Sequence, residues 1–246
     1  MAIRTRIGLL VPSTNSTAEP DFQMVAPKDV TIHSHRLWLT NEGLSGEGMD
    51  RMNAEVEQGA TYLATAKVNA IAYACTTGSF YKGPGYDQEM VACMKRAAGA
   101  PAVATAPAMV QALRFFGARS ISVATPYNAW QNDRLREYFS SLGFRVLNVE
   151  GEPVASRAGA QGHCDQPPES VLEFASRVCH PEADVLLCPC TAWRSLEVVK
   201  ALEERTGKPV VSANQATIWA TFRRLDIIRA NSGFGSLIDS LAKAHA

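Results

Sequence analysis

Two stretches far apart in this chain end a predicted strand in the same way. Residues 73–80 (YACTTGSF) follow an apolar run over 68–74, and residues 187–193 (LCPCTAW) follow another over 183–187. Each run predicts a buried strand, and each leads into Cys-Thr and then a helical pattern. A cysteine at such a junction lies near the N–H groups of a helix N-terminus, which lowers a thiol pKa. We interpret Cys75 and Cys190 as two reactive thiols that two halves of the chain contribute to one site.

Apolar runs alternate with helical patterns along the whole chain. Strands are expected over 7–11, 30–39, 69–74, 103–105, 120–125, 144–149, 183–188 and 209–211. Helices are expected over 46–66, 88–98, 107–116, 130–142, 169–178, 195–204 and 214–225. This alternation predicts an α/β fold with mostly parallel, doubly wound sheets, whose ligands bind at the carboxyl ends of strands.

The chain also matches itself. Val11-Pro-Ser-Thr-Asn15 corresponds to Thr125-Pro-Tyr-Asn128, at nearly the same offset as the two cysteines. One duplication explains both offsets. We therefore expect two pseudo-symmetric half-domains, over 1–116 and 117–225, with the active site in the cleft between them. A tail over 226–246 follows, and it is expected to pack on the first half.

Composition excludes several classes of protein. The 24 basic and 24 acidic residues balance and form no block of like charge, which argues against binding to nucleic acid or a membrane surface. The apolar run over 7–11 is too short for a signal sequence or a membrane span, so a cytoplasmic location is expected. The six cysteines follow no disulfide-scaffold spacing and are expected to be reduced.

No cofactor or metal is expected. Cys188-Pro-Cys190 resembles half of a zinc site, but no second pair of cysteines completes it. Such a site would have to recruit His163 and Cys164, or Cys179 and His180, from elsewhere in the chain.

Two thiols on opposite walls of a cleft support two kinds of chemistry. One thiolate and one thiol can remove and return a proton at a carbon acid, or one thiolate can attack a double bond while the other protonates the neighbouring carbon. Both routes place negative charge on carboxylate oxygens. Hydroxyls and N–H groups of Thr76, Thr77, Tyr127 and Thr191 are candidates to hold that charge. The opposite interpretation is that both cysteines are inert core residues.

The segment over 13–17 (STNST) is rich in residues that bind anions or cap helices. We select Ser13 and Asn15 as candidate substrate-binding residues. The alternative is an ordinary strand-to-helix turn with Ser16 or Thr17 as the N-cap.

These motifs resemble the aspartate/glutamate racemase superfamily, in the branch that holds maleate cis-trans isomerases and arylmalonate decarboxylases. Residues 7–15 (IGLLVPSTN) resemble the isomerases' first strand and substrate loop, and residues 75–83 (CTTGSFYKG) resemble the decarboxylase segment GTSLSFYRG. Cys75 stands where the decarboxylases have lost their first cysteine. Cys190 aligns with the second family cysteine, and Tyr127 with a tyrosine that binds a carboxylate.

The resemblance implies a cofactor-independent isomerase of a small carboxylic or dicarboxylic acid, with Cys75 as nucleophile and Cys190 as acid/base. Asn15 and Tyr127 would bind carboxylates, helped by Thr76, Thr77 and Thr191. Among the possible reactions, maleate-type cis-trans isomerisation is the first choice, and the resemblance also implies a homodimer. The alternatives are a racemase, an arylmalonate-type decarboxylase of an α-substituted acid, or a binding protein without turnover.

The segment over 151–168 departs from the isomerase pattern. The isomerases carry a further substrate-binding asparagine there, whereas this chain has Arg157, His163 and Asp165. Arg157 or His163 would replace the asparagine, or each is an ordinary solvated loop residue. The mixed Gly, Ser, Ala and Gln content of the segment predicts a lid or a mobile loop.

Overall fold

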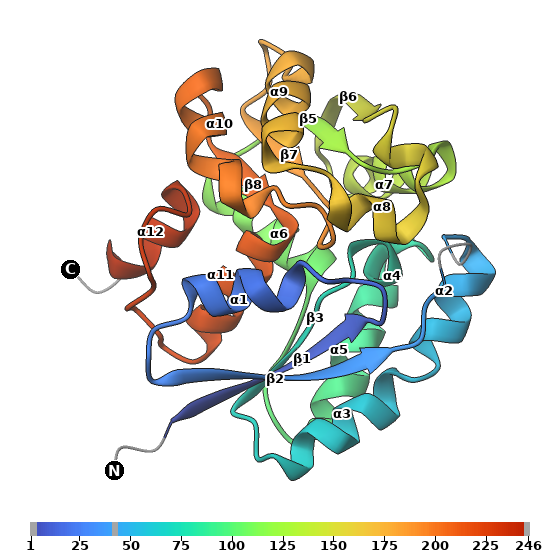
Figure 1. Ribbon diagram of the computed structural model, residues 1–246, viewed down its shortest axis with the longest axis vertical. Coiled ribbons are helices and arrows are strands. Elements are labelled where there is room, and N and C mark those ends of the chain that lie inside the picture. The colour runs from blue at the N-terminus through green and yellow to red at the C-terminus, as the bar shows by residue number, and fades with distance from the viewer. Residues whose placement is uncertain (1–3, 41–43, 244–246) are drawn as a thin grey trace.

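The computed structural model describes residues 4–40 and 44–243, and it contains two four-stranded sheets (Figure 1). All strand pairs in both sheets are parallel. The first sheet has the order β2-β1-β3-β4. Its strands are β1 (Thr5–Pro12), β2 (Val30–Leu37), β3 (Ala70–Tyr73) and β4 (Ala102–Ala104).

The second sheet repeats this arrangement with the order β6-β5-β7-β8. Its strands are β5 (Ser120–Thr125), β6 (Arg145–Gly151), β7 (Val185–Cys188) and β8 (Val210–Ser212). In each sheet the first and third strands of the half lie side by side at the centre. Every residue of β3 and β7 is buried, as expected for strands covered on both faces. The predicted α/β fold with two pseudo-symmetric parallel sheets is confirmed.

Helices cover both faces of the first sheet. α3 and α5 pack on one face, and α1 packs on the other beside α11. The helices of this half are α1 (Ala18–Val25), α2 (Gly46–Asn53), α3 (Val56–Thr65), α4 (Thr76–Phe80), α5 (Tyr86–Ala98) and α6 (Thr105–Phe115). A single helix was expected over 46–66, but it is broken between Asn53 and Val56. Glu55 lies at the break, where its carboxylate accepts a hydrogen bond from the Trp38 N–H at the end of β2.

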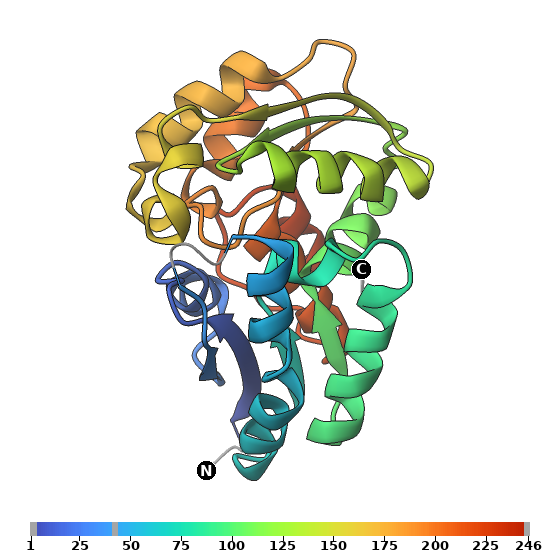
Figure 2. The same cartoon turned by 90° about the vertical axis from the view of Figure 1, so that its right-hand side faces the viewer.

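The second sheet lies between α7 on one face and α9 and α10 on the other (Figure 2). The helical elements of this half are α7 (Ala129–Ser141), η1 (Ala155–Arg157), α8 (Gly159–Asp165), α9 (Pro168–Val178), η2 (Leu196–Val198), α10 (Val199–Thr206), α11 (Ala213–Arg224) and α12 (Ser236–Lys243). The expected irregular segment over 151–168 thus contains a short helix, α8. In both views α8, drawn in yellow, lies at the boundary between the two halves.

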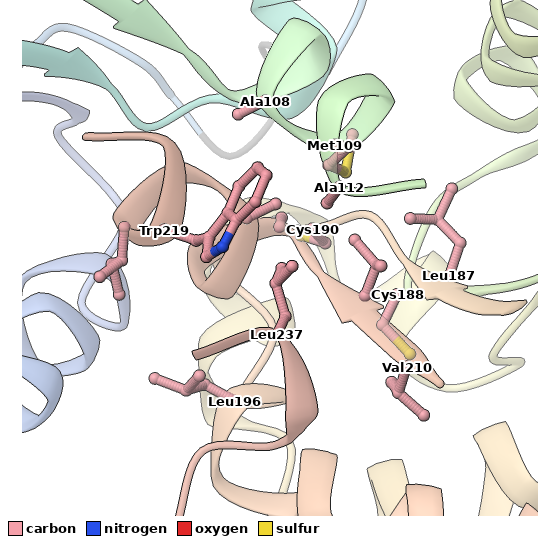
Figure 3. Close-up of a cluster of buried hydrophobic side chains, with 14 of the residues drawn as sticks. Ala108, Met109, Ala112, Leu187, Cys188, Cys190, Leu196, Val210, Trp219 and Leu237 are labelled. Carbon is pink, nitrogen blue, oxygen red and sulfur yellow. The ribbon is translucent and has the colours of Figure 1, made fainter. Parts of the chain in front are cut away.

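The two halves share the larger of two buried clusters because the helix after the fourth strand of each half packs against the other half. α6 contacts β8, and α11 contacts β3, β4 and α6. Met109 of α6, Trp219 of α11 and Leu237 of α12 belong to one buried cluster, which also includes Cys188 and Cys190 (Figure 3).

The predicted division at 116/117 separates the two sheets but assigns α11 to the half opposite the sheet on which it packs. The tail contacts both halves: Asn231 donates a hydrogen bond to the Val25 carbonyl, whereas α12 packs on α11 and β8. Residues 1–3, 41–43 and 244–246, which the predicted first half and tail include, lie outside the described residues. The domain boundaries remain a prediction.

Candidate active site

Both cysteines occupy the same position in their half of the molecule. Cys75 comes two residues after β3 and is the N-cap residue of α4, and Cys190 comes two residues after β7. The carboxyl ends of the two central strands face each other across the boundary between the halves. Cys75 and Cys190 therefore line a single cavity, although they lie far apart in the sequence.

This cavity is small and partly open. Its volume is about 40 Å³, a few times the space that one water molecule needs. Cys75 and Cys190 are only 7% and 4% exposed. The cavity is lined by Pro12, Thr14, Asn15, Leu39, Leu44, Met49, Cys75, Thr76, Thr77, Tyr127, Gln131, Ala160, His163, Cys190, Thr191 and Ala192. Among the described residues that form its wall there is no Asp, Glu, Lys or Arg.

Thr191 ties the two cysteine loops together. Its hydroxyl donates to the carbonyl of Ala74, the residue before Cys75, at 3.0 Å. The same oxygen accepts a hydrogen bond from Asn15 Nδ2 at 3.1 Å. These buried bonds fix the spacing of the two walls, because each joins segments from different halves.

Asn15 also shapes the loop after β1. Its Oδ1 accepts hydrogen bonds from the N–H groups of Thr17 and Ala18 at 2.9 and 3.0 Å, at the start of α1, where Thr17 is the N-cap residue as the alternative interpretation expected. The Thr17 hydroxyl donates to the Ala192 carbonyl at 2.9 Å, which adds another link to the Cys190 loop. The amide of Asn15 is thereby held in the cavity wall, with its Nδ2 facing the second half.

The remaining hydroxyls of the wall differ in how they are used. Thr77 Oγ1 accepts a hydrogen bond from Gln131 Nε2 at 2.9 Å, and the Tyr127 hydroxyl donates to the Pro189 carbonyl just before Cys190. The Thr76 hydroxyl is buried and has no hydrogen-bond partner of standard geometry. A buried hydroxyl without a partner is unfavourable unless a ligand supplies one, which makes Thr76 a candidate contact for an anionic substrate.

The prediction that helix N-termini lower the thiol pKa values is wrong for this structure. Burial raises the pKa of Cys75 to about 11 and that of Cys190 to about 12, because it disfavours a thiolate. The backbone of Gly78 and the Tyr73 side chain act in the opposite direction on Cys75, but their effect is smaller. α4 has only five residues, so its amides cannot offset the loss of solvent.

A family model for arylmalonate decarboxylase matches residues 7–238, nearly the whole chain. The chain belongs to the arylmalonate decarboxylase family. Relatives of this family with two different names are similar to it over their full lengths. A maleate isomerase of Nocardia farcinica is 31% identical over 97% of this chain and 96% of its own. An arylmalonate decarboxylase of Bordetella bronchiseptica is 26% identical over 95% and 96%.

Solved structures agree with the family assignment. Nocardia farcinica maleate cis-trans isomerase bound to TRIS has a TM-score of 0.88 and 26% identity, covering 98% of this chain and 100% of that one. A mutant of the Nocardia enzyme, solved with a covalently bound succinylcysteine intermediate, has a TM-score of 0.87 and 26% identity, covering 95% and 98%.

Seven of the eight candidate site residues of this family member line the cavity, and Ser13 does not. The Ser13 hydroxyl donates to the Leu39 carbonyl at 3.1 Å and accepts from the Leu39 N–H at 2.9 Å. It thus joins the loop after β1 to the end of β2. The roles of all eight residues in substrate binding and catalysis remain predictions.

Sequence reasoning did not identify Gln131 or the apolar wall residues Leu39, Leu44, Met49 and Ala160. Gln131 lies in α7 and belongs to a capping box with Asn128, which is a local signal for a helix start but not for a site. Its side chain reaches the cavity only because α7 begins at the carboxyl end of β5. Nothing in the local sequence marks that approach.

The segment over 151–168 contributes through α8. Ala160 and His163 lie one turn apart on α8 and both face the cavity, whereas Arg157 and Asp165 are exposed. His163 is only 3% exposed, so it is not a solvated loop residue. Burial lowers its pKa to about 4, partly opposed by the backbone of Pro126. The imidazole is therefore neutral at physiological pH.

Within residues 4–40 and 44–243, no three His, Cys, Asp or Glu side chains gather so that they would hold a metal ion. None of the helices in that part of the chain combines the length and apolarity needed to cross a bilayer.

Proposed function

We propose that this protein is a cofactor-independent isomerase that converts maleate to fumarate through a covalent cysteine adduct. The observation that carries the proposal is the pair Cys75 and Cys190 in one cavity, each at the equivalent strand end of its half. The relationship to maleate isomerases, one of them with a succinylcysteine intermediate, supports this choice.

The reaction would begin at Cys75. Its thiol passes its proton to a carboxylate of the bound maleate, which returns the proton when the sulfur later leaves, and the thiolate sulfur forms a bond to one alkene carbon of maleate while the C=C π bond breaks. Cys190 donates its thiol proton to the neighbouring carbon, which gives an S-succinyl adduct. The two alkene carbons are now joined by a single bond, so the adduct can rotate.

Elimination reverses these steps. The Cys190 thiolate takes a proton from the carbon next to the C–S bond, the double bond forms again, and the Cys75 sulfur leaves as thiolate. Protons and electrons balance over the cycle, and no oxidant, reductant or cofactor is consumed. The more stable trans product, fumarate, is released.

Neutral donors around the cavity would hold the two carboxylates. Asn15 Nδ2 and the hydroxyls of Thr76, Thr77 and Tyr127 all lie in its wall. The Thr77 hydroxyl accepts from Gln131 and keeps its own proton for a carboxylate, whereas the Tyr127 proton would turn from the Pro189 carbonyl to the substrate. We propose that Thr191 acts mainly by fixing the cysteine loops, since its proton is donated to the Ala74 carbonyl. Such fixed donors stabilise charge that develops on the carboxylate next to the reacting carbon.

Proton NMR of maleate in D₂O tests the reaction directly. We expect wild-type protein to produce fumarate, Cys75→Ala to produce none, and Cys190→Ser to be slowed by at least about a hundredfold. Cys93→Ala is the matched control, because Cys93 lies on α5 outside the cavity wall, and it should keep full activity. Full activity of Cys75→Ala would contradict the covalent mechanism.

A wild-type protein silent on maleate would direct attention to the racemase or decarboxylase alternatives. Chiral α-substituted acids would then be tested for solvent deuterium at the α-carbon, and arylmalonates for loss of CO₂. The cytoplasmic location and the homodimer belong to the same proposal. All six cysteines are free, which fits chemistry that needs reduced thiols, and light scattering on the purified protein tests the dimer.

A further inference from the structure

The proposed substrate and the cavity wall do not match in charge. Maleate and fumarate carry two carboxylates, whereas no Lys or Arg among the described residues lines the cavity. Placing two negative charges in a buried site without a cation is strongly unfavourable. Hydrogen bonds from Asn15, Thr76 and Tyr127 relieve only part of this penalty, because each donor is neutral.

Only one group in the described part of the wall can become a cation. The titratable residues that line the cavity are Cys75, Cys190, Tyr127 and His163. Ionisation of a thiol or a phenol adds negative charge, whereas imidazole gains a positive charge when it binds a proton. His163 is therefore the one described wall residue whose titration can offset a dicarboxylate.

The surroundings of His163 leave it free to respond to a ligand. Its ring lies beside the Tyr127 ring, with centroids 6.1 Å apart, and it makes a hydrogen bond to the backbone of Pro126. On its own helix, Cys164 makes contacts with Ser16 and Thr14, and Asp165 is exposed. From the other elements, Cys75 and Cys190 share the cavity with it, and no described acidic or basic side chain lies in the wall.

We propose that His163 takes up a proton when a dicarboxylate enters the cavity and binds the substrate as an imidazolium ion. This inference rests on the proposed function and assigns a specificity role to α8. A monocarboxylate would raise the pKa of His163 less than a dicarboxylate does. Proton uptake by His163 therefore favours the binding of dianions. Because the group becomes charged only with the substrate in place, the cavity wall otherwise stays neutral.

The required change is large but within what buried charges produce. Burial holds the pKa of His163 near 4, so nearly complete protonation at pH 7.5 requires a rise of about four and a half units. By linkage, the dicarboxylate must bind the protonated protein about thirty-thousandfold more tightly than the neutral one. Two carboxylates at close range in a poorly solvated cavity can supply such a preference.

Proton uptake can be measured without turnover. Calorimetric titration of Cys75→Ala protein with maleate at pH 7.5, in two buffers of different ionisation enthalpy, gives the protons bound per ligand. Tris is avoided because a related isomerase has been solved with it bound. We expect uptake close to one proton. Cys75→Ala/His163→Gln should show little uptake and at least about tenfold weaker binding, because the cation is lost.

The matched control is Cys75→Ala/His180→Gln. His180 lies outside the cavity wall, next to Glu182, so its replacement should leave proton uptake unchanged. Two readouts do not depend on how well the His163→Gln substitution is tolerated. The Kd of Cys75→Ala protein should rise with pH, by up to about tenfold per unit. The ring-proton NMR signal of His163 should move to the imidazolium position on saturation.

The outcomes separate this inference from the proposed function. Binding without proton uptake, or uptake that persists in the His163→Gln background, overturns the role of His163 and leaves isomerisation standing. No binding of maleate, together with no conversion by wild-type protein, overturns both. Uptake that depends on His163, with an imidazolium signal, supports the inference.

Discussion

The thiol of Cys75 is protonated near neutral pH because burial raises its pKa to about 11. Only the thiolate attacks an alkene, so catalysis must include a step in which this proton leaves. Cys190, with a pKa raised to about 12, keeps its proton and is suited to donate it. At the scale of single residues, the two thiols thus have a common protonated resting state, and the different roles proposed for them would arise when substrate binds.

Alkylation tests this resting state. Labelling of Cys75 by iodoacetamide, followed by peptide mass spectrometry, should be at least about tenfold slower at pH 8 in folded protein than in urea-unfolded protein. The raised pKa keeps the thiolate fraction small until the pH approaches 11, so the folded rate should climb through pH 10 while the unfolded rate levels near 9. Faster labelling of folded than of unfolded protein at pH 7 would instead support the lowered thiol pKa that the sequence predicted.

At the scale of elements, the strands could be predicted and two helical segments could not. β3 and β7 are buried on both faces, so each is a plain apolar run, and the cysteines follow at the sheet edge where parallel strands end. The apolar residues over 46–66 follow one helical periodicity on both sides of the break at Glu55. The sequence pattern therefore gives no sign of the break. α8 contains Gly159 and Gly162, and glycine predicts poor helix formation, so its helical state depends on packing.

The site residues could be predicted only where a reactive or polar side chain comes just after a strand. Cys75, Asn15 and Tyr127 follow strands directly, and the topology brings them together. Ser13 has the same kind of position, but its hydroxyl bonds to the Leu39 backbone. The sign of the thiol pKa shifts depends on burial, which exists only after α8 and both halves have come together around the two cysteines. No local pattern carries that information.

α8 offers a steric test of the cavity. Ala160 is buried and lines it, so Ala160→Leu places three additional carbons into a volume of about 40 Å³. We expect KM for maleate to rise at least about tenfold, while the melting temperature falls by only a few degrees because α8 can shift outward. Steady-state kinetics and thermal unfolding measure both. Ala158→Leu, on the exposed side of the same segment, is the control, and an unchanged KM for Ala160→Leu would place the substrate elsewhere.

At the scale of the whole molecule, the halves repeat one topology and share the larger of their two buried clusters. The helix after the fourth strand of each half packs against the other half, and the cluster around Met109 and Trp219 includes residues of β1 and of β5. The cavity lies where these halves meet. The shared core and the Thr191 hydrogen bonds therefore determine how rigid its walls are. Folding of one half is therefore expected to require the other.

Met109→Ala tests this dependence. Met109 is fully buried on α6, so its truncation should lower the free energy of unfolding by about 2–4 kcal/mol. If the core is shared, hydrogen exchange followed by mass spectrometry should show peptides of β1 and β5 losing protection together, in step with loss of isomerase activity in urea. Val154→Ala, at a side chain that is 73% exposed, should change stability by less than about 0.5 kcal/mol. Loss of protection in one sheet while the other keeps it would instead favour two independent domains with a boundary near residue 116.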